Sequence, residues 1–361
     1  MRRTIIGRHS FTGRGALSNP PGRFDKQQLD SVDDGWYQDE VPESIPTTLE
    51  PDRAREIIST NDSPDIPFEQ SINPYRGCET SCVYCYARPS HAYMGLSPGR
   101  DFETRLFYKA DAARVLEEQL ARPGYVCKSI TLGANTDPYQ PVERRMKVTR
   151  SILEVLARTR HPVSVITKHA LVLRDLDLLT DLARDGLASV AVSVTTLDNE
   201  LKRAMEPRAA SPQARLRALA ELSAAGVPTA VMVAPVIPVL TDHELESILA
   251  AAAQAGVRHA GYVLLRLPYE IKDLFREWLA EHYPDHAAHV MSVIRDMRGG
   301  RDNDPRFGAR MRGTGPYAAL LRNRFHLACQ RLNLNAARRE ELRTMLFQPP
   351  TPPGSQLRLG L

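Results

Sequence analysis

Three of the five cysteines in this 361-residue chain lie within one short stretch. Cys78, Cys82 and Cys85 occur in NPYRGCETSCVYCYAR, residues 73–88. Thiolates this close in sequence can hold a metal ion or an iron–sulfur cluster. A structural zinc ion takes four nitrogen or sulfur ligands, and His91 is a conceivable fourth ligand. A [4Fe–4S] cluster held by only three cysteines would instead keep one iron open to bind another molecule.

The C-x3-C-x-aromatic-C pattern, with Tyr84 as the aromatic residue, resembles the signature of the radical S-adenosylmethionine (radical SAM) enzymes. In that family the open iron chelates the amino and carboxylate groups of S-adenosylmethionine. An electron from the cluster then cleaves the sulfonium and gives a 5′-deoxyadenosyl radical. The resemblance implies an enzyme that abstracts a hydrogen atom, with a [4Fe–4S] cluster and S-adenosylmethionine as cofactors. It also implies a reductant such as flavodoxin or ferredoxin as a partner.

The wider frame NPYRGC…YCYAR resembles a narrower branch, related to spore photoproduct lyase and called DNA repair photolyase-like. This resemblance covers roughly residues 71–267 and implies a lyase or modifying enzyme. It includes the segments TDPYQPVE (136–143), ITKHALVLRD (166–175), SVTTLD (193–198), APVIPVLTD (234–242) and LRLPYE (265–270). Each segment falls at the carboxyl end of a candidate strand, where barrel enzymes place their chemistry.

The resemblance by position implies cofactor contacts at several of these strand ends. Asn135, Thr136 and Asp137 offer acceptors for the ammonium of S-adenosylmethionine, although Asn, Asp and Pro also form ordinary turns. Lys168 can meet the cofactor carboxylate or an anionic substrate, or can be an exposed loop lysine. The complete set of expected cofactor-binding residues is Tyr84, Tyr86, Asn135, Thr136, Asp137, Lys168, Ser193, Thr195, Glu206, Arg208 and Arg266.

The remaining members of this set also have simpler interpretations. Ser193 and Thr195 are implied to contact the ribose, but both residue types are common in strands. Glu206 and Arg208 could bind the cofactor or pair with each other on the surface. Arg266 could lie near the adenine or cap the barrel. The rings of Tyr84 and Tyr86 could pack against adenine or shield the cluster from water.

The sequence does not identify the substrate, and it assigns no catalytic residue. Spore photoproduct lyase keeps a hydrogen-donating cysteine in the loop after its second strand, where this chain has Asn135. Cys127 lies at the opposite end of that strand, so we expect no efficient photoproduct reversal by that route. Nucleic acid remains one candidate substrate, and a peptide or small molecule is another. A third alternative is a non-catalytic iron–sulfur or zinc-binding protein.

Alternating strands and helices frame these motifs. Short β-branched runs predict strands near 69–73 and at 127–132, 163–167, 189–195, 229–235 and 260–266. Amphipathic helices are predicted between them, as at 147–159, 212–226 and 242–256, the last two ending in glycine. About six repeats predict an α/β fold with a parallel sheet, an open or partial barrel. The family resemblance likewise implies a partial (β/α)6 barrel.

Composition divides the chain into four segments. We expect an irregular N-terminal arm at 1–70, the partial barrel at 71–285, an Arg/Gly-rich loop with helices at 286–348 and a disordered tail at 349–361. The chain has 42% hydrophobic residues, no apolar run of membrane-spanning length and no secretory signal. Five cysteines, an odd number, argue against a disulfide framework. We therefore expect a cytoplasmic protein, a monomer with no membrane partner.

Overall fold

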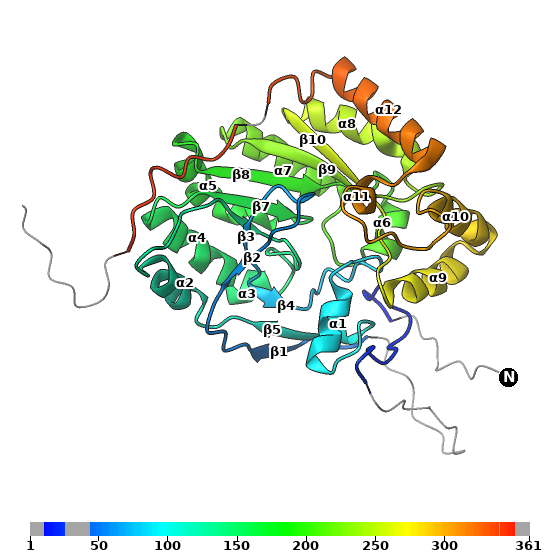
Figure 1. Ribbon diagram of the computed structural model, residues 1–361, viewed down its shortest axis with the longest axis horizontal. Helices are drawn as coiled ribbons and strands as arrows, with labels where there is room; N and C mark the ends of the chain where they lie inside the picture. Colours follow the sequence, from blue (N-terminus) through cyan, green and yellow to red (C-terminus); the bar gives the residue numbers. More distant parts are fainter. Residues whose placement is uncertain (1–10, 26–43, 339, 351–361) are drawn as a thin grey trace, which may run out of the picture.

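The computed structural model describes residues 11–25, 44–338 and 340–350, and its main feature is a seven-stranded sheet (Figure 1). The strand order is β10-β9-β8-β7-β6-β3-β2, and neighbours run parallel except for the antiparallel pair β2 and β3. The strands are β2 (Ile58–Thr60), β3 (Gln70–Ile72), β6 (Ile130–Leu132), β7 (Val163–Thr167), β8 (Ala188–Ser193), β9 (Thr229–Val236) and β10 (His259–Leu264). The predicted parallel α/β architecture is thus confirmed, with β10 and β2 as its open edges.

Helices pack against the outer face of this sheet (Figure 1). The principal ones are α2 (Ala112–Leu120), α4 (Val148–Arg158), α5 (Leu176–Arg184), α7 (Pro212–Ala224) and α8 (Leu245–Gln254). Helix α7 begins as its sequence indicates, because the Ser211 hydroxyl accepts a hydrogen bond from the Ala214 amide. Gly226 and Gly256 follow α7 and α8 with φ of 80° and 84°, the left-handed conformation that ends a helix.

The inner face of the sheet carries small and polar side chains. Val190, Val192, Val231 and Val233 belong to the apolar core shared with the helices. Because side chains alternate along a strand, the residues between them face the barrel interior. Those inner positions include Ser71, Thr131, Ser164, Ala191, Ser193, Ala230, Met232 and Gly261. Most of these inner residues are small or polar, in contrast to the apolar outer face.

The N-terminal stretch expected to be irregular contains regular structure. Strand β1 (Thr48–Pro51) pairs in parallel with β5 (Arg105–Tyr108), and β5 also pairs with β4 (Tyr75–Arg76). Strand β2 of the main sheet also falls within this stretch. Its short strands give little periodicity, which is why the sequence pattern missed them. Residues 1–10 and 26–43 of the expected arm lie outside the described residues.

The C-terminal part packs beside the open edge of the barrel. Its helices are α9 (Ile271–His282), α10 (Pro284–Asp296), α11 (Ala309–Arg312) and α12 (Gly315–Arg331). The Asn335 side chain pairs with both the amide and the carbonyl of Ala260, and so covers part of the free edge of β10. Most of the expected disordered tail, from residue 351 onward, lies outside the described residues.

Short helical segments complete the described chain: η1 (Arg88–Met94), α1 (Asp101–Thr104), α3 (Glu143–Met146), η2 (Ala170–Asp175), α6 (Asn199–Met205) and η3 (Asp242–Glu244). Segment η1 follows the cysteine loop directly, and α6 lies between β8 and α7. None of the helices in the described residues is both long and apolar enough to cross a membrane.

Candidate active site

The three clustered cysteines lie in the loop between β4 and η1, at the carboxyl end of the sheet. Cys78 and Cys82 are buried, Cys85 is half-buried, and all three are free thiols. Burial raises the pKa of Cys78 to about 12 and also raises the pKa of Cys82 and Cys85. A bound metal centre reverses this because its positive charge stabilises the thiolate.

Buried ionic contacts hold the cysteine loop in shape. The Arg88 guanidinium, fully buried, donates two hydrogen bonds to the Cys82 carbonyl, at 2.9 and 2.7 Å, and forms an ion pair with Glu103. The other contacts of the Glu103 carboxylate are the backbone amides of Gly15 and Ala16, at 3.0 and 2.8 Å. The N-terminal segment 11–25 is therefore tied to the loop through one buried carboxylate.

A buried polar cluster lies beside the cysteines, at the ends of β7 and β8. The Glu206 carboxylate accepts hydrogen bonds from the Tyr84 hydroxyl and, at 2.7 Å, from the Thr195 hydroxyl, and forms an ion pair with Arg215. Burial raises the pKa of Glu206, although the Arg215 charge opposes the shift. The Lys168 Nζ atom lies 4.0 Å from Glu206 Oε1 and donates to the Ala234 carbonyl at 3.1 Å.

Lys168 connects this cluster to the cysteines electrostatically. Burial lowers its pKa and the nearby Arg215 charge acts in the same direction, while a thiolate at Cys82 and the Asp137 carboxylate favour its charged form. The ammonium has three donor positions and the carbonyl of Ala234 occupies one. The Lys168 ammonium is therefore a partly desolvated cation, and its remaining N–H groups can donate to an anionic ligand.

The loop after β6 carries the other expected polar residues. Asp137 accepts hydrogen bonds from the Tyr139 amide (2.9 Å), the Thr167 hydroxyl (2.7 Å) and the Lys168 amide (2.7 Å). A carboxylate has about four acceptor positions, so one remains. The Thr136 hydroxyl donates to the Tyr75 carbonyl at 2.9 Å, whereas Asn135 is exposed. Asp137 thus stabilises the turn after β6 and joins it to the end of β7. One acceptor position of its carboxylate remains available for a ligand.

Comparison with known proteins identifies this arrangement. A sequence model of the Radical SAM superfamily matches residues 72–252, which is half of the chain. This chain belongs to the radical SAM superfamily. It is therefore an enzyme, and the family implies S-adenosylmethionine and a [4Fe–4S] cluster as its cofactors.

Several relatives resemble this radical SAM chain. Uncharacterized protein Rv2578c of Mycobacterium tuberculosis (strain ATCC 25618 / H37Rv) is 39% identical over 232 residues, 64% of this chain and 68% of that protein. Uncharacterized protein MJ0683 of Methanocaldococcus jannaschii is 30% identical over 48% of this chain and 62% of that protein. A solved structure of spore photoproduct lyase, complexed with dinucleoside spore photoproduct, superimposes with a TM-score of 0.57 over 79% of both chains at 15% identity. That likeness shows a shared fold.

Two other expected residues of the radical SAM site meet across the barrel mouth. The Tyr86 hydroxyl donates to the Ala134 carbonyl after β6, and the Arg266 guanidinium lies 5.4 Å from the Tyr86 ring centre. The buried Nε of Arg266 has no hydrogen-bond partner in the described part of the chain. Tyr86 therefore bridges strand ends beside the cysteine loop.

The suggested surface pair of Glu206 and Arg208 was wrong. Glu206 pairs with Arg215 inside the barrel, and Arg208 forms an ion pair with Glu79 at 2.8 Å. The short spacing in sequence was misleading because Glu206 ends α6 facing inward. Ser193 is buried nearby, and its carbonyl accepts a hydrogen bond from Arg215 at 3.0 Å.

The zinc alternative finds little support in the placement of His91. Its Nε2 lies 3.0 Å from the Arg105 carbonyl, and its ring packs against Phe102 with centres 5.1 Å apart. Burial lowers the pKa of His91 to about 4. Among the described residues, no group of three or more His, Cys, Asp or Glu side chains is placed to hold a single metal ion. A cubane cluster does not need that arrangement, because each thiolate binds a different iron.

Sequence reasoning missed several residues that shape this site. Thr80 lies between Cys78 and His169: its hydroxyl oxygen is 3.3 Å from Cys78 Sγ and 2.9 Å from His169 Nε2. Arg88, Glu103 and Arg215 were missed as well. The only signal for Thr80 was its position inside the cysteine motif, and nothing local indicated its partner 89 residues away.

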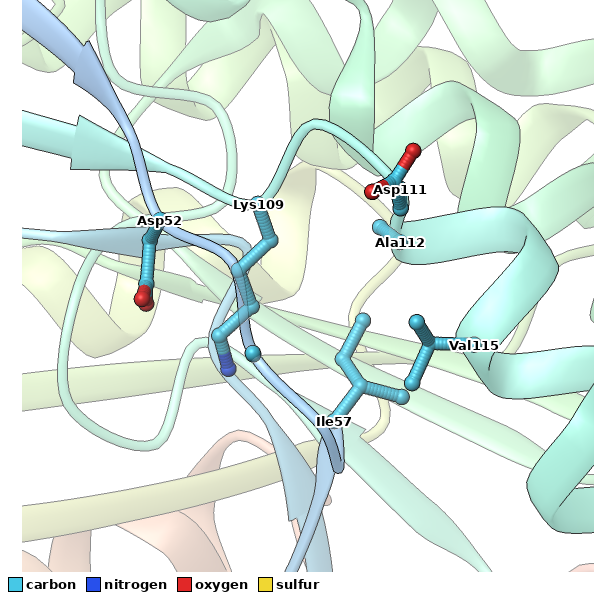
Figure 2. Close-up of a pocket in the computed structure, with 7 residues that line it drawn as sticks. Asp52, Ile57, Lys109, Asp111, Ala112 and Val115 are labelled. Carbon is cyan, nitrogen blue, oxygen red and sulfur yellow. The ribbon is translucent and has the colours of Figure 1, made fainter.

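A small hollow elsewhere is unrelated to this site. Figure 2 shows Asp52, Lys109 and Asp111 at its rim, with Ile57 and Val115 as its apolar wall. Its volume is about 10 Å³, close to that of a single water molecule, so it cannot accept a substrate or a cofactor.

Proposed function

We propose that this radical SAM enzyme binds a [4Fe–4S] cluster through Cys78, Cys82 and Cys85 and abstracts a hydrogen atom from its substrate. The observation that carries the proposal is the gathering of three free, largely buried thiols beside a polar cluster at the carboxyl end of the sheet. When bound, the cluster supplies the electron that cleaves S-adenosylmethionine. A reductant such as flavodoxin or ferredoxin would deliver that electron.

The chain's own residues divide the binding of S-adenosylmethionine between them. Lys168 offers free ammonium donors to the carboxylate of the methionine moiety, and Asp137 offers its remaining acceptor to the ammonium. Thr195 is held in place by Glu206, which Arg215 and Tyr84 fix in turn. Tyr86 and Arg266 form a stacked pair at the mouth that can pack on a flat ring such as adenine.

The substrate we propose is nucleic acid or one of its components. The shared fold with spore photoproduct lyase supports this choice, and that enzyme's structure contains a dinucleoside photoproduct. The exposed Asn135 side chain has no thiol hydrogen to donate, so the reaction does not use a cysteine from this loop. A peptide or small-molecule substrate is the competing proposal, and the barrel interior itself does not favour either.

The test of cluster binding uses anaerobically reconstituted protein. We expect about four irons and four sulfides per chain, the content of one cubane cluster. Single Cys→Ala changes at Cys78, Cys82 and Cys85 should each abolish the brown absorbance, whereas the matched controls Cys127→Ala and Cys329→Ala should retain it. Loss of the cluster in the Cys329 variant would show that the ligand set is wrong.

The test of the chemistry is the release of 5′-deoxyadenosine. With dithionite and S-adenosylmethionine, the reconstituted protein should produce it slowly even without substrate. Lys168→Met should lower this rate and weaken S-adenosylmethionine binding roughly 10-fold or more, since a charge-assisted hydrogen bond contributes about 1.5–3 kcal/mol. A fully loaded cluster that yields no 5′-deoxyadenosine and whose spectrum ignores S-adenosylmethionine would leave only a structural cluster.

A further inference from the structure

A large cavity lies at the free edge of β10, away from the cysteine loop. Its volume is about 620 Å³, within the usual range for small-molecule sites. Strands β9 and β10 form one wall, and α11 with α12 form the other. The cavity is lined by Met232, Ala260, Gly261, Tyr262, Arg312, Arg322, Asn323, Phe325, His326 and Asn335.

The lining of this cavity is cationic and contains no carboxylate. Neither Arg312 nor Arg322 has an ion pair or a side-chain hydrogen bond within the part of the chain that the structure describes. Nearby arginines behave differently: Arg310 pairs with Asp65, and Arg324 pairs with Glu246 at 2.7 Å. Two unneutralised guanidiniums facing one cavity favour an anionic ligand.

A buried hydroxyl without a partner lies in the same wall. Tyr262 is 7% exposed, and its ring packs on Phe325 with centres 4.8 Å apart. No hydrogen-bond partner of its hydroxyl occurs among the described residues. A buried polar group left unpaired costs free energy, so this donor is suited to a ligand rich in acceptors.

The cavity also reaches the inner wall of the barrel. Gly261 lies opposite Met232 in the β9–β10 register, and a Cβ added to Gly261 would lie 2.9 Å from the Met232 sulfur. The absence of a side chain at Gly261 leaves Met232 accessible from the cavity. Met232 precedes Ala234 by two residues on the same strand face, about 7 Å along the strand. The Ala234 carbonyl contacts Lys168 and Thr195, at 3.1 and 3.3 Å.

We propose that this cavity binds a phosphate-bearing ligand, with the phosphate between Arg312 and Arg322. Two guanidinium forks, the Asn323 amide and the Tyr262 hydroxyl provide more donors than one carboxylate can accept, whereas a phosphate group has three or more acceptor oxygens. The ligand is a nucleotide unit, either free or in a nucleic acid. Its role as an anchor for the substrate rests on the proposed radical function, but its binding does not.

The test measures binding of a short fluorescein-labelled single-stranded DNA to full-length reconstituted protein, with AMP and inorganic phosphate as competitors. The variants are Arg312→Gln, Arg322→Gln and their combination. Arg331→Gln is the matched control, because it removes the same charge from the exposed end of α12 outside the cavity. Iron content and the slow release of 5′-deoxyadenosine are measured on each preparation, so a failure of the radical function is seen separately.

We expect the double variant to weaken binding at least 10-fold and to lower the salt slope by about 1.4, the value for two phosphate contacts on single-stranded DNA. Tyr262→Phe should weaken binding several-fold, and Arg331→Gln should change it less than 2-fold. Competition by AMP would identify a free nucleotide, and its absence would identify the nucleic acid backbone; both support the proposal. An equal loss of binding in the Arg331→Gln control would overturn the proposal. So would the absence of binding by the labelled DNA, AMP and inorganic phosphate alike.

Discussion

At the scale of single residues, the environment of Cys78 differs from that of the other two clustered cysteines. Its sulfur lies 3.3 Å from the Thr80 hydroxyl, which in turn lies 2.9 Å from His169 Nε2. Thr80 and His169 are both buried. With a thiolate at Cys78, the Thr80 hydroxyl can donate to the sulfur and His169 can donate to Thr80. Hydrogen bonds to a cluster sulfur stabilise the more negative, reduced state.

We therefore expect Thr80→Val to make the midpoint potential of the cluster more negative while iron content is retained. Electron paramagnetic resonance during a redox titration measures this potential. Thr80→Ser keeps the hydroxyl and should restore the original value. His169→Phe should shift the potential in the same direction by a smaller amount. An unchanged potential in a fully loaded Thr80→Val protein would show that this hydroxyl does not act on the cluster.

At the scale of elements, the cysteine loop depends on a segment far away in sequence. Gly15 lies against the loop so closely that an added Cβ would collide with the Ser81 carbonyl oxygen. Ser18 hydrogen-bonds Glu277 of α9 at 2.5 Å, and Asn19 hydrogen-bonds Asp101 of α1 at 3.1 Å. Figure 1 shows this dark-blue segment beside α1 and α9. It closes one side of the proposed cluster site.

Gly15→Ala should displace this segment and expose the cluster. We expect faster loss of iron to a chelator, because van der Waals overlap with backbone cannot be relieved by a side-chain rotation. Gly124→Ala is the control: it has open space around it and only an unfavourable φ of 82°. The rate of iron loss to a chelator is measured for both variants. Equal rates would mean that segment 11–25 does not protect the site.

Another element, the C-terminal stretch near residue 347, packs on a buried histidine. The His161 ring lies 5.2 Å from the Phe347 ring and bonds to the Tyr125 hydroxyl at 2.8 Å. Burial lowers the pKa of His161 to about 4, below its ordinary value of 6.5. The unfolded state therefore binds a proton more readily. The stabilising effect of neutral His161 is full above pH 6.5 and is lost as the pH falls toward 4.

We expect the free energy of unfolding of the native protein to fall more than that of His161→Gln between pH 7.5 and 5.5. The difference between the two proteins should shrink by about 1 kcal/mol over this range. Urea unfolding curves at both pH values measure it. A difference that is independent of pH would show that His161 does not titrate with a lowered pKa.

At the scale of the whole molecule, the barrel is open between β10 and β2, and one ion pair spans that side. The Arg310 guanidinium, in α11 after β10, pairs with both oxygens of Asp65 in the connection between β2 and β3. The Asp65 carboxylate also accepts the Gly308 amide at 3.1 Å. Arg298, almost fully buried, donates to the carbonyls of Leu265 and Ala309, both at 2.7 Å. These arginines hold the C-terminal loop against the open side of the barrel.

Asp65→Asn should loosen the loop at 299–312 without unfolding the barrel. A bidentate ion pair that is largely shielded from water contributes more to stability than an exposed one. Its effect here should be local, because the pair joins only this loop to the connection between β2 and β3. Hydrogen exchange should become faster in this loop and remain unchanged in β7 and β8. Asp52→Asn, which breaks a pair with Arg76 elsewhere, is the control. Equal protection of the loop in both variants would contradict the closing role.

The sequence alone determined the cysteine motif, the alternation of strands and helices and the helix ends at Gly226 and Gly256. These features depend on residues close together in the chain, where spacing and backbone preference act directly. The resemblance also selected Lys168, Thr195 and Glu206 as cofactor-binding residues, and the structure brings these three together.

Only the tertiary structure decided which charged groups meet. It joined Glu206 to Arg215 rather than Arg208, gave Asp137 three hydrogen-bond donors and linked Asp65 to Arg310. It also brought Gly15 against Ser81 and Thr80 to His169. Most of these partners are 30 or more residues apart, so no local pattern selects them. Their pairing follows from the packing of whole elements, which removes water from some charges and forces each to find a partner.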